Sequence, residues 1–138
     1  MIFYKPFRIT LAILAGLLFL TSCEPEGENV NFTAEEMVGT YNCAEKSQVY
    51  SSSNYEVIVS KSAASSSQIT VENFYQLGIS ASVKVNINGS DLIIPKQVVN
   101  NITISGDGVI ISKSRMNLNY TADDGGGVVD VVSGGLSK

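Results

Sequence analysis

Apolar and polar residues alternate along much of the chain from about residue 40 onward. The alternation is clearest at 55–60, 83–88 and 116–121, where β-branched or aromatic residues occupy every second position. Successive side chains of a strand point to opposite faces, so this pattern predicts strands with one buried and one solvated face. Such half-buried strands are typical of antiparallel sheets.

Short polar segments that contain glycine separate the predicted strands. Asn88-Gly89 is the clearest of them, because an Asn-Gly pair readily adopts the positive φ angles of a two-residue hairpin loop. The same apolar residues face inward whether that loop begins at Asn88 or at Gly89. Segments 105–108 and 123–127 predict two further hairpins.

The hairpins follow one another without a helical crossover, which predicts an all-β, up-and-down antiparallel meander. An open meander would leave two sheet edges prone to aggregation, so we expect closure into a small barrel, with a β-sandwich as the alternative. Pro95 should mark an edge, a bulge or a strand end. We expect about eight strands, near residues 40–46, 54–61, 68–75, 81–88, 91–97, 101–106, 109–114 and 116–122, with a ninth near 127–133.

One short helical turn should precede the strands. Thr33 and Glu36 have the spacing of a capping box, and Phe32 and Met37 have that of a hydrophobic staple. Gly39 follows at a position where helices commonly end. Because so short a helix is unstable alone in water, it should be docked on the barrel.

The apolar faces of the strands should form the barrel interior. Eight-stranded barrels either fill this space with side chains or hold one small ligand there. The inward residues are bulky and the strands are short, so we expect a packed core. The residues expected in the interior include Tyr41, Cys43, Tyr55, Val57, Val83, Val85, Ile104, Leu118 and Tyr120.

The first residues of the chain have a different character. A mostly apolar run at 9–20 follows two basic residues; it is shorter than the roughly 18–20 residues of a membrane-spanning helix and is typical of a signal peptide. It ends in Leu20-Thr21-Ser22-Cys23, which resembles the lipobox of bacterial lipoproteins. The resemblance implies that residues 1–22 are removed and that acyl chains on Cys23 hold the protein to a membrane.

Acidic residues follow the cysteine directly. Glu24, Glu26 and Glu28 resemble the surface-export signal of Bacteroidota-type lipoproteins, which implies an outer-membrane lipoprotein exposed on the cell surface. A solvated linker is the alternative reading of the same residues. The chain then divides into a lipoprotein signal peptide (1–22), a lipidated acidic tether (23–31) and a barrel domain (32–138).

Charge and composition exclude several classes of function. The net charge is −4, and from Met37 onward acids and bases nearly balance, so we expect no basic surface for nucleic acid. The sequence contains no histidine, which removes Ser-His and Cys-His catalysis and most zinc sites. With Cys23 acylated, Cys43 has no disulfide partner and is either buried or an intermolecular site.

Carboxylates could still support chemistry without histidine. Glu45, Glu56 and Glu72 lie on neighbouring early strands, where a pair of them could hydrolyse glycosides. Acids on the polar face of a strand are, however, usually solvated. We therefore expect no enzyme activity, no cofactor and no metal.

Several motifs beyond the tether resemble the lipocalin-like small lipoproteins of Bacteroidota. The resemblance implies a small antiparallel barrel behind a short helical turn, and it brings no assigned activity. The motifs that carry it are Gly39-Thr40-Tyr41, Asn73-Phe74, Ile94-Pro95-Lys96-Gln97, Ser105-Gly106-Asp107-Gly108 and Leu118-Asn119-Tyr120-Thr121.

Aromatic residues in the predicted loops are the candidate binding residues. Tyr50 lies in a serine-rich segment, and Phe74 and Tyr75 lie at a strand end. Such residues can anchor an interface or cap the end of a barrel. We interpret the protein as a non-catalytic binding or accessory module for a macromolecular partner, either an envelope protein or a glycan. A carrier of a small apolar ligand in the barrel interior is the alternative.

Overall fold

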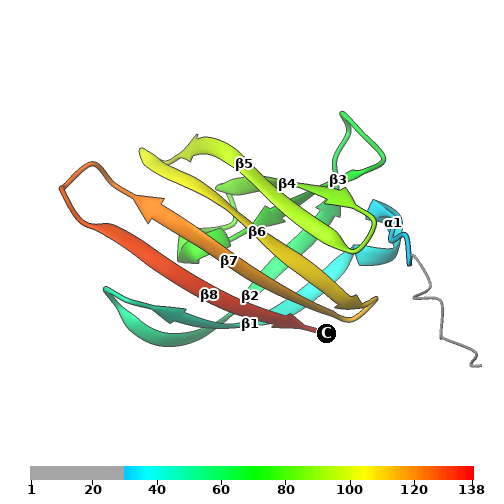
Figure 1. Ribbon diagram of the computed structural model, residues 1–138, viewed down its shortest axis with the longest axis horizontal. Coiled ribbons are helices and arrows are strands. Elements are labelled where there is room, and N and C mark those ends of the chain that lie inside the picture. Colours follow the sequence, from blue (N-terminus) through cyan, green and yellow to red (C-terminus); the bar gives the residue numbers. More distant parts are fainter. Residues whose placement is uncertain (1–29) are drawn as a thin grey trace, which may run out of the picture.

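A computed structural model describes residues 30–138, which form an eight-stranded antiparallel barrel (Figure 1). Each strand pairs with the next along the chain, and β8 pairs back with β1, so the sheet closes on itself. The predicted up-and-down barrel is confirmed. The elements are α1 (Ala34–Met37), β1 (Gly39–Ser47), β2 (Ser51–Lys61), β3 (Gln68–Glu72), η1 (Phe74–Gln76), β4 (Ser82–Asn88), β5 (Asp91–Val99), β6 (Ile102–Ser112), β7 (Arg115–Asp123) and β8 (Val129–Ser137).

The lipoprotein predictions concern a part of the chain that lies outside the described residues. These are the signal peptide 1–22, the lipidation site Cys23 and the acidic residues Glu24, Glu26 and Glu28. Within residues 30–138, no helix is long and apolar enough to cross a membrane.

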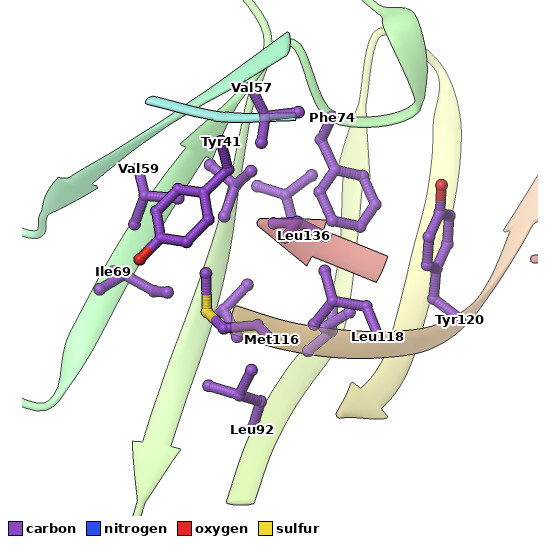
Figure 2. Packing of buried hydrophobic residues seen from close by; sticks show 14 of the residues in the cluster. Tyr41, Val57, Val59, Ile69, Phe74, Leu92, Met116, Leu118, Tyr120 and Leu136 are labelled. Atoms are coloured by element: carbon purple, nitrogen blue, oxygen red, sulfur yellow. The ribbon is translucent and has the colours of Figure 1, made fainter. Parts of the chain in front are cut away.

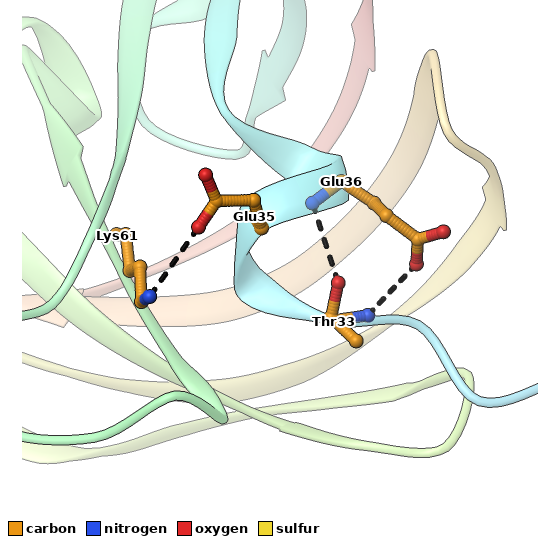
Figure 3. Close-up of polar contacts among 4 residues, drawn as sticks. All are labelled: Thr33, Glu35, Glu36 and Lys61. Carbon is orange, nitrogen blue, oxygen red and sulfur yellow. Dashed lines mark hydrogen bonds and ion pairs between the residues drawn. The ribbon is translucent and has the colours of Figure 1, made fainter.

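The helix α1 is a single turn that covers one end of the barrel. The Thr33 hydroxyl accepts a hydrogen bond from the Glu36 N–H at 3.4 Å, and the Glu36 carboxylate accepts one from the Thr33 N–H at 3.0 Å (Figure 3). The predicted capping box is therefore confirmed. Met37 is fully buried, and Phe32 packs against the same core. Docking on the barrel stabilises a helix that would be marginal alone.

The hairpin predicted at 105–108 is wrong. Strand β6 runs without interruption through these residues, so the two short strands expected at 101–106 and 109–114 are one. Gly106 is needed because β7 passes very close: a Cβ at this position would lie 2.6 Å from the Cα of Tyr120. Glycine inside a strand can mark such a close backbone approach as well as a turn.

The turn that joins β5 to β6 is instead Asn100-Asn101. Val99 pairs with Ile102, which leaves these two asparagines as the loop. Their φ angles are 49° and 64°, and asparagine tolerates this left-handed conformation better than most residues. Positive φ at both central residues is the mark of a type I′ hairpin turn.

Three other details refine the predicted strands. The third strand ends at Glu72 and not at 75, because Asn73 takes a left-handed conformation with φ 60°. Pro95 lies at a register shift between Ile94 and Gln97, which agrees with the predicted bulge. The loop of the β4–β5 hairpin is Gly89-Ser90, the later of the two alternatives, since Asn88 pairs with Asp91.

The barrel interior is filled with side chains (Figure 2). Of the nine residues expected there, eight are buried, and Tyr55 is half-buried because it lies towards one end. The enclosed space left between Cys43, Tyr55, Phe74 and their neighbours is about 10 Å³. That is about the room one water molecule needs, so the described interior is packed and not hollow.

Candidate functional site

The barrel has two dissimilar ends, which lie at opposite sides of Figure 1. We call the helix end the one that carries α1, the connections 62–67, 89–90 and 113–114, and Lys138. The loop end carries the connections 48–50, 73–81, 100–101 and 124–128. All three candidate binding residues, Tyr50, Phe74 and Tyr75, belong to the loop end.

The connection 73–81 folds into the barrel at this end. Asn73, Tyr75 and Gln76 have φ angles of 60°, 54° and 57°, a left-handed conformation that costs a non-glycine residue roughly 1–2 kcal/mol. The Asn73 side chain holds the connection in place, because its amide donates to the Glu56 carbonyl at 2.8 Å and its oxygen accepts from the Gly78 N–H at 3.0 Å.

This local strain directs the ring of Phe74 into the core. Phe74 is 3% exposed, and its ring centroid lies 4.5 Å from that of Tyr120 (Figure 2). The ring therefore closes the loop end of the interior, as a capping aromatic residue would. Removing it would leave the void beneath it open towards the loops.

A buried carboxylate lies just beneath this cap. Glu45 is 4% exposed, and its Oε2 accepts hydrogen bonds from the hydroxyls of Tyr55 and Tyr120, both at 2.5 Å. Burial, together with the neighbouring charge of Glu45, raises the pKa of both phenols above its ordinary value. Both tyrosines therefore remain protonated donors at neutral pH.

Cys43 lies next to this carboxylate on the same strand face. Burial raises the pKa of its thiol to about 11, with Glu45 adding in the same direction. At neutral pH the side chain is a buried thiol, whereas a nucleophilic cysteine needs the thiolate. Of the two readings of Cys43, the structure supports core packing.

A second buried carboxylate, Asp130, organises the rim. It is 3% exposed and accepts four hydrogen bonds: from the hydroxyls of Ser47 (2.5 Å) and Tyr75 (2.7 Å), and from the N–H groups of Gln48 (3.0 Å) and Val49 (3.2 Å). Burial raises its pKa, but these donors outweigh burial and hold the pKa below its ordinary value. Four donors fill the acceptor sites of a carboxylate, so Asp130 serves to fix the rim.

Tyr75 thereby becomes the centre of an aromatic group at the rim. Its ring centroid lies 6.3 Å from that of Tyr50 and 6.1 Å from that of Tyr120, both in edge-to-face geometry. Tyr50 is 68% exposed, so its ring is open to solvent. The structure brings together the three aromatic residues that the sequence had singled out, although Phe74 lies in the core and not on the surface.

Two hollows flank the Tyr50–Tyr75 pair. The first, the mouth pocket, has a volume of about 220 Å³. It is lined by Val49, Tyr50, Tyr75, Ile102, Ala122, Asp124, Gly126, Val128 and Asp130. The second, the side pocket, has a volume of about 360 Å³. It is lined by Glu45, Ser47, Tyr50, Ser51, Ser53, Tyr75 and Gln76.

Sequence reasoning placed Glu45 on the wrong face of its strand. It was grouped with Glu56 and Glu72 as a solvated acid, yet Glu56 is exposed and Glu72 half-buried while Glu45 faces the interior. The alternation itself carried the signal, because Glu45 has the same parity as Tyr41 and Cys43. Asp130 was missed entirely, since nothing local distinguishes it. No group of three or more metal-binding side chains gathers among residues 30–138.

Comparison with known protein families and with curated proteins finds no match to this chain. Solved structures of β-barrels do resemble it. A redesigned β-barrel, mFAP1, bound to DFHBI has a TM-score of 0.56 at 16% identity, covering 76% of this chain and 97% of that chain. EF1p2_mFAP2b bound to DFHBI has a TM-score of 0.52 at 14% identity, covering 76% of this chain and 95% of that chain. A further redesigned barrel, b11L5F_LGL, gives 0.53 at 15%, covering 76% and 93%. Likeness at these identities shows the fold.

Proposed function

We propose that this protein is a lipid-anchored lipoprotein of the cell envelope whose barrel is a non-catalytic binding module for a small molecule. The ligand would be taken up at the loop end, beside Tyr50 and Tyr75. The observation that carries this proposal is the pair of hollows on either side of these rings, with Tyr75 fixed by a carboxylate that has no acceptor site to spare. Barrels of similar fold that hold DFHBI support a small ligand.

The packed interior decides where such a ligand would bind. An enclosed space of about 10 Å³ admits no ligand beyond water, which argues against an apolar molecule carried at the barrel centre. The mouth and side pockets, at about 220 and 360 Å³, match a ligand of fragment size. The buried thiol of Cys43 favours binding over covalent chemistry.

The lipid anchor and the cell-surface location rest on residues 20–28 of the sequence. The described chain begins at residue 30 and meets the barrel at the helix end, so an anchor at Cys23 would leave the loop end at the far side of the barrel. Two or three acyl chains hold a protein durably to a bilayer. A Cys23→Ser variant should therefore appear in the soluble fraction of cells, and the unchanged protein should extract with detergent.

A macromolecular partner is the second candidate, and the distribution of exposed apolar residues favours it. The loop end and the strand residues next to it carry seven large apolar side chains that are at least 46% exposed, and exposed apolar surface can mark an interface. These are Val49, Tyr50, Ile79, Val98, Val128, Val129 and Val131. Cross-linking on intact cells followed by mass spectrometry would reveal a protein partner, and competition with soluble polysaccharide would reveal a glycan.

Backbone-amide NMR with a set of small aromatic fragments tests the small-molecule proposal. Binding should shift the amide signals of residues 47–51, 74–76 and 124–130, and a Tyr50→Ala variant should weaken it at least fivefold. Val38→Ala is the matched control, because Val38 is also an exposed apolar residue but lies beside α1 at the helix end. Shifts confined to the helix end, or equal effects of the two variants, would overturn the proposal.

A further inference from the structure

The barrel wall is incomplete beside the side pocket. Strand β2 pairs with β3 through Ile58–Lys61, so its preceding residues extend past the end of β3. There η1 takes the place of a neighbouring strand and meets β2 through side chains. Asn73 donates to the Glu56 carbonyl, and the Gln76 amide donates to the Ser53 hydroxyl at 2.9 Å. Between Ser51 and Val57, β2 therefore has no backbone pairing with β3, and the side pocket lies beside this stretch.

Glu45 lines the side pocket with one carboxylate oxygen left without a hydrogen bond from residues 30–138. Both phenolic donors go to Oε2, and no hydrogen bond within residues 30–138 reaches Oε1. Glu45 as a whole is only 4% exposed, but within residues 30–138 no fully buried polar side-chain atom lacks a hydrogen bond, so the unpaired Oε1 is accessible from the side pocket that Glu45 lines. A ligand in the side pocket that donates a hydrogen bond to Oε1 would give both oxygens of the Glu45 carboxylate a partner.

The charges around the pocket indicate the kind of donor. No lysine or arginine lines the side pocket, and the four connections of the loop end contain none. Asp123, Asp124 and Asp130 add further negative charge at this end of the barrel. The ring faces of tyrosines attract cations, and Tyr50 and Tyr75 line the same pocket. An ammonium group satisfies both the carboxylate and the rings, and it forms a stronger hydrogen bond to a carboxylate than a neutral donor does.

Resting on the binding function proposed above, we infer that the side pocket binds a small primary amine in its protonated form. The ammonium group would donate to Oε1 of Glu45, and the hydrocarbon part would pack against the rings of Tyr50 and Tyr75. The pocket volume of about 360 Å³ lies at the lower end of the range for small-molecule sites. Ser51 and Ser53 at the pocket wall can accept the remaining ammonium hydrogens.

Calorimetric titration with two matched probes tests this inference. Phenethylammonium and 2-phenylethanol have the same ring and chain and differ in carrying an ammonium or a hydroxyl group. The ammonium probe should bind the unchanged protein at least tenfold more tightly at low ionic strength. Glu45→Gln should remove that preference, because an amide oxygen can still accept from both phenols but carries no charge. Glu56→Gln, which changes an exposed acid on β2, should leave the preference intact.

The outcomes separate this inference from the broader proposal. The amine site would be overturned if the two probes bind equally, or if the preference for the ammonium probe persists in Glu45→Gln. The small-molecule function would still stand if the alcohol binds beside Tyr50. Failure of both probes would overturn the amine site, while the fragment experiment decides the function independently. If Glu45→Gln does not fold, the ¹³C signal of the Glu45 carboxyl in the unchanged protein replaces it. That signal should move with phenethylammonium and not with 2-phenylethanol, and the reverse result would overturn the inference.

Discussion

At the helix end, the interior is covered by apolar residues of α1, Ala34 and Met37, which are fully buried. The Tyr41 hydroxyl beneath them has neutral partners: it donates towards the carbonyls of Met37 (2.9 Å) and Lys113 (3.2 Å). At the loop end, two buried carboxylates and three tyrosine hydroxyls form the layer beneath the rim. A cover of apolar groups suffices to close a barrel, so the costlier polar arrangement at the other end calls for a functional reason.

The ends also differ in backbone strain and in charge. Within residues 30–138, all six non-glycine residues with positive φ belong to the loop-end connections or adjoin them: Ser51, Asn73, Tyr75, Gln76, Asn100 and Asn101. Basic residues gather at the helix end, where Lys61 and Lys113 pair with acids of α1. Strained residues cluster where a site needs a fixed geometry that packing alone would not select. The helix end is thus closed mainly by apolar packing, and the polar, strained loop end is where the proposed binding site would lie.

The largest expected effect comes from removing the aromatic cap of the loop end. Phe74→Ala should lower the free energy of unfolding by about 3–5 kcal/mol, the usual cost of truncating a buried phenylalanine. It should also let solvent reach Tyr55 and Tyr120, which lie below the ring. Urea denaturation measures the first effect, and iodide quenching of tyrosine fluorescence measures the second. A loss below 1 kcal/mol would mean that Phe74 does not close the interior.

Asp130→Asn should lower the free energy of unfolding at neutral pH by about 2–3 kcal/mol, somewhat less than Phe74→Ala does. The charged hydrogen bonds are lost, and the amide N–H₂ group would face groups that are themselves donors. The effect depends on pH with a definite sign. The pKa of Asp130 is lowered in the folded protein, so its contribution to stability is present above the unfolded pKa of roughly 4 and is lost as the pH falls through the folded pKa. Urea denaturation should therefore show a smaller difference in stability between Asp130→Asn and the unchanged protein at pH 3 than at pH 7. A constant difference would contradict a charged Asp130.

Individual residues show which features of the structure could be predicted from the sequence and which could not. Alternation and hairpin chemistry are local, so the barrel, the capping box and the β4–β5 and β7–β8 hairpins could be predicted. Gly106 could not be assigned in this way, because its role depends on how closely β7 approaches it, a contact between distant parts of the chain. Phe74 and Tyr75 were recognisable as loop aromatics, but their tie to Asp130 spans the whole barrel and leaves no local pattern. Glu45 was readable by parity and was overlooked because acids are usually solvated.

A pair of tyrosine variants sharpens the comparison between the two ends. Tyr120→Phe removes a hydroxyl that donates to Glu45, and hydrogen bonds to a carboxylate contribute about 1.5–3 kcal/mol. Tyr41→Phe removes one that donates to backbone carbonyls, which contributes about 0.5–1.5 kcal/mol. Tyr120→Phe should therefore be the more destabilising of the two by urea denaturation. The reverse order would show that the polar layer at the loop end adds little to stability.

The smallest expected effect lies at the helix end, in the ion pair between Lys61 and Glu35. The two charged groups are 3.3 Å apart, but their side chains are 49% and 78% exposed (Figure 3). Exposed pairs contribute about 0.2–1 kcal/mol and are screened by salt, so Lys61→Met should lower stability by less than about 0.5 kcal/mol in 0.15 M salt. Denaturation curves for the variant and the unchanged protein should merge in 1 M salt. A loss above 1 kcal/mol that survives high salt would show that the helix end depends on charge as much as the loop end does, and would remove the contrast drawn between them.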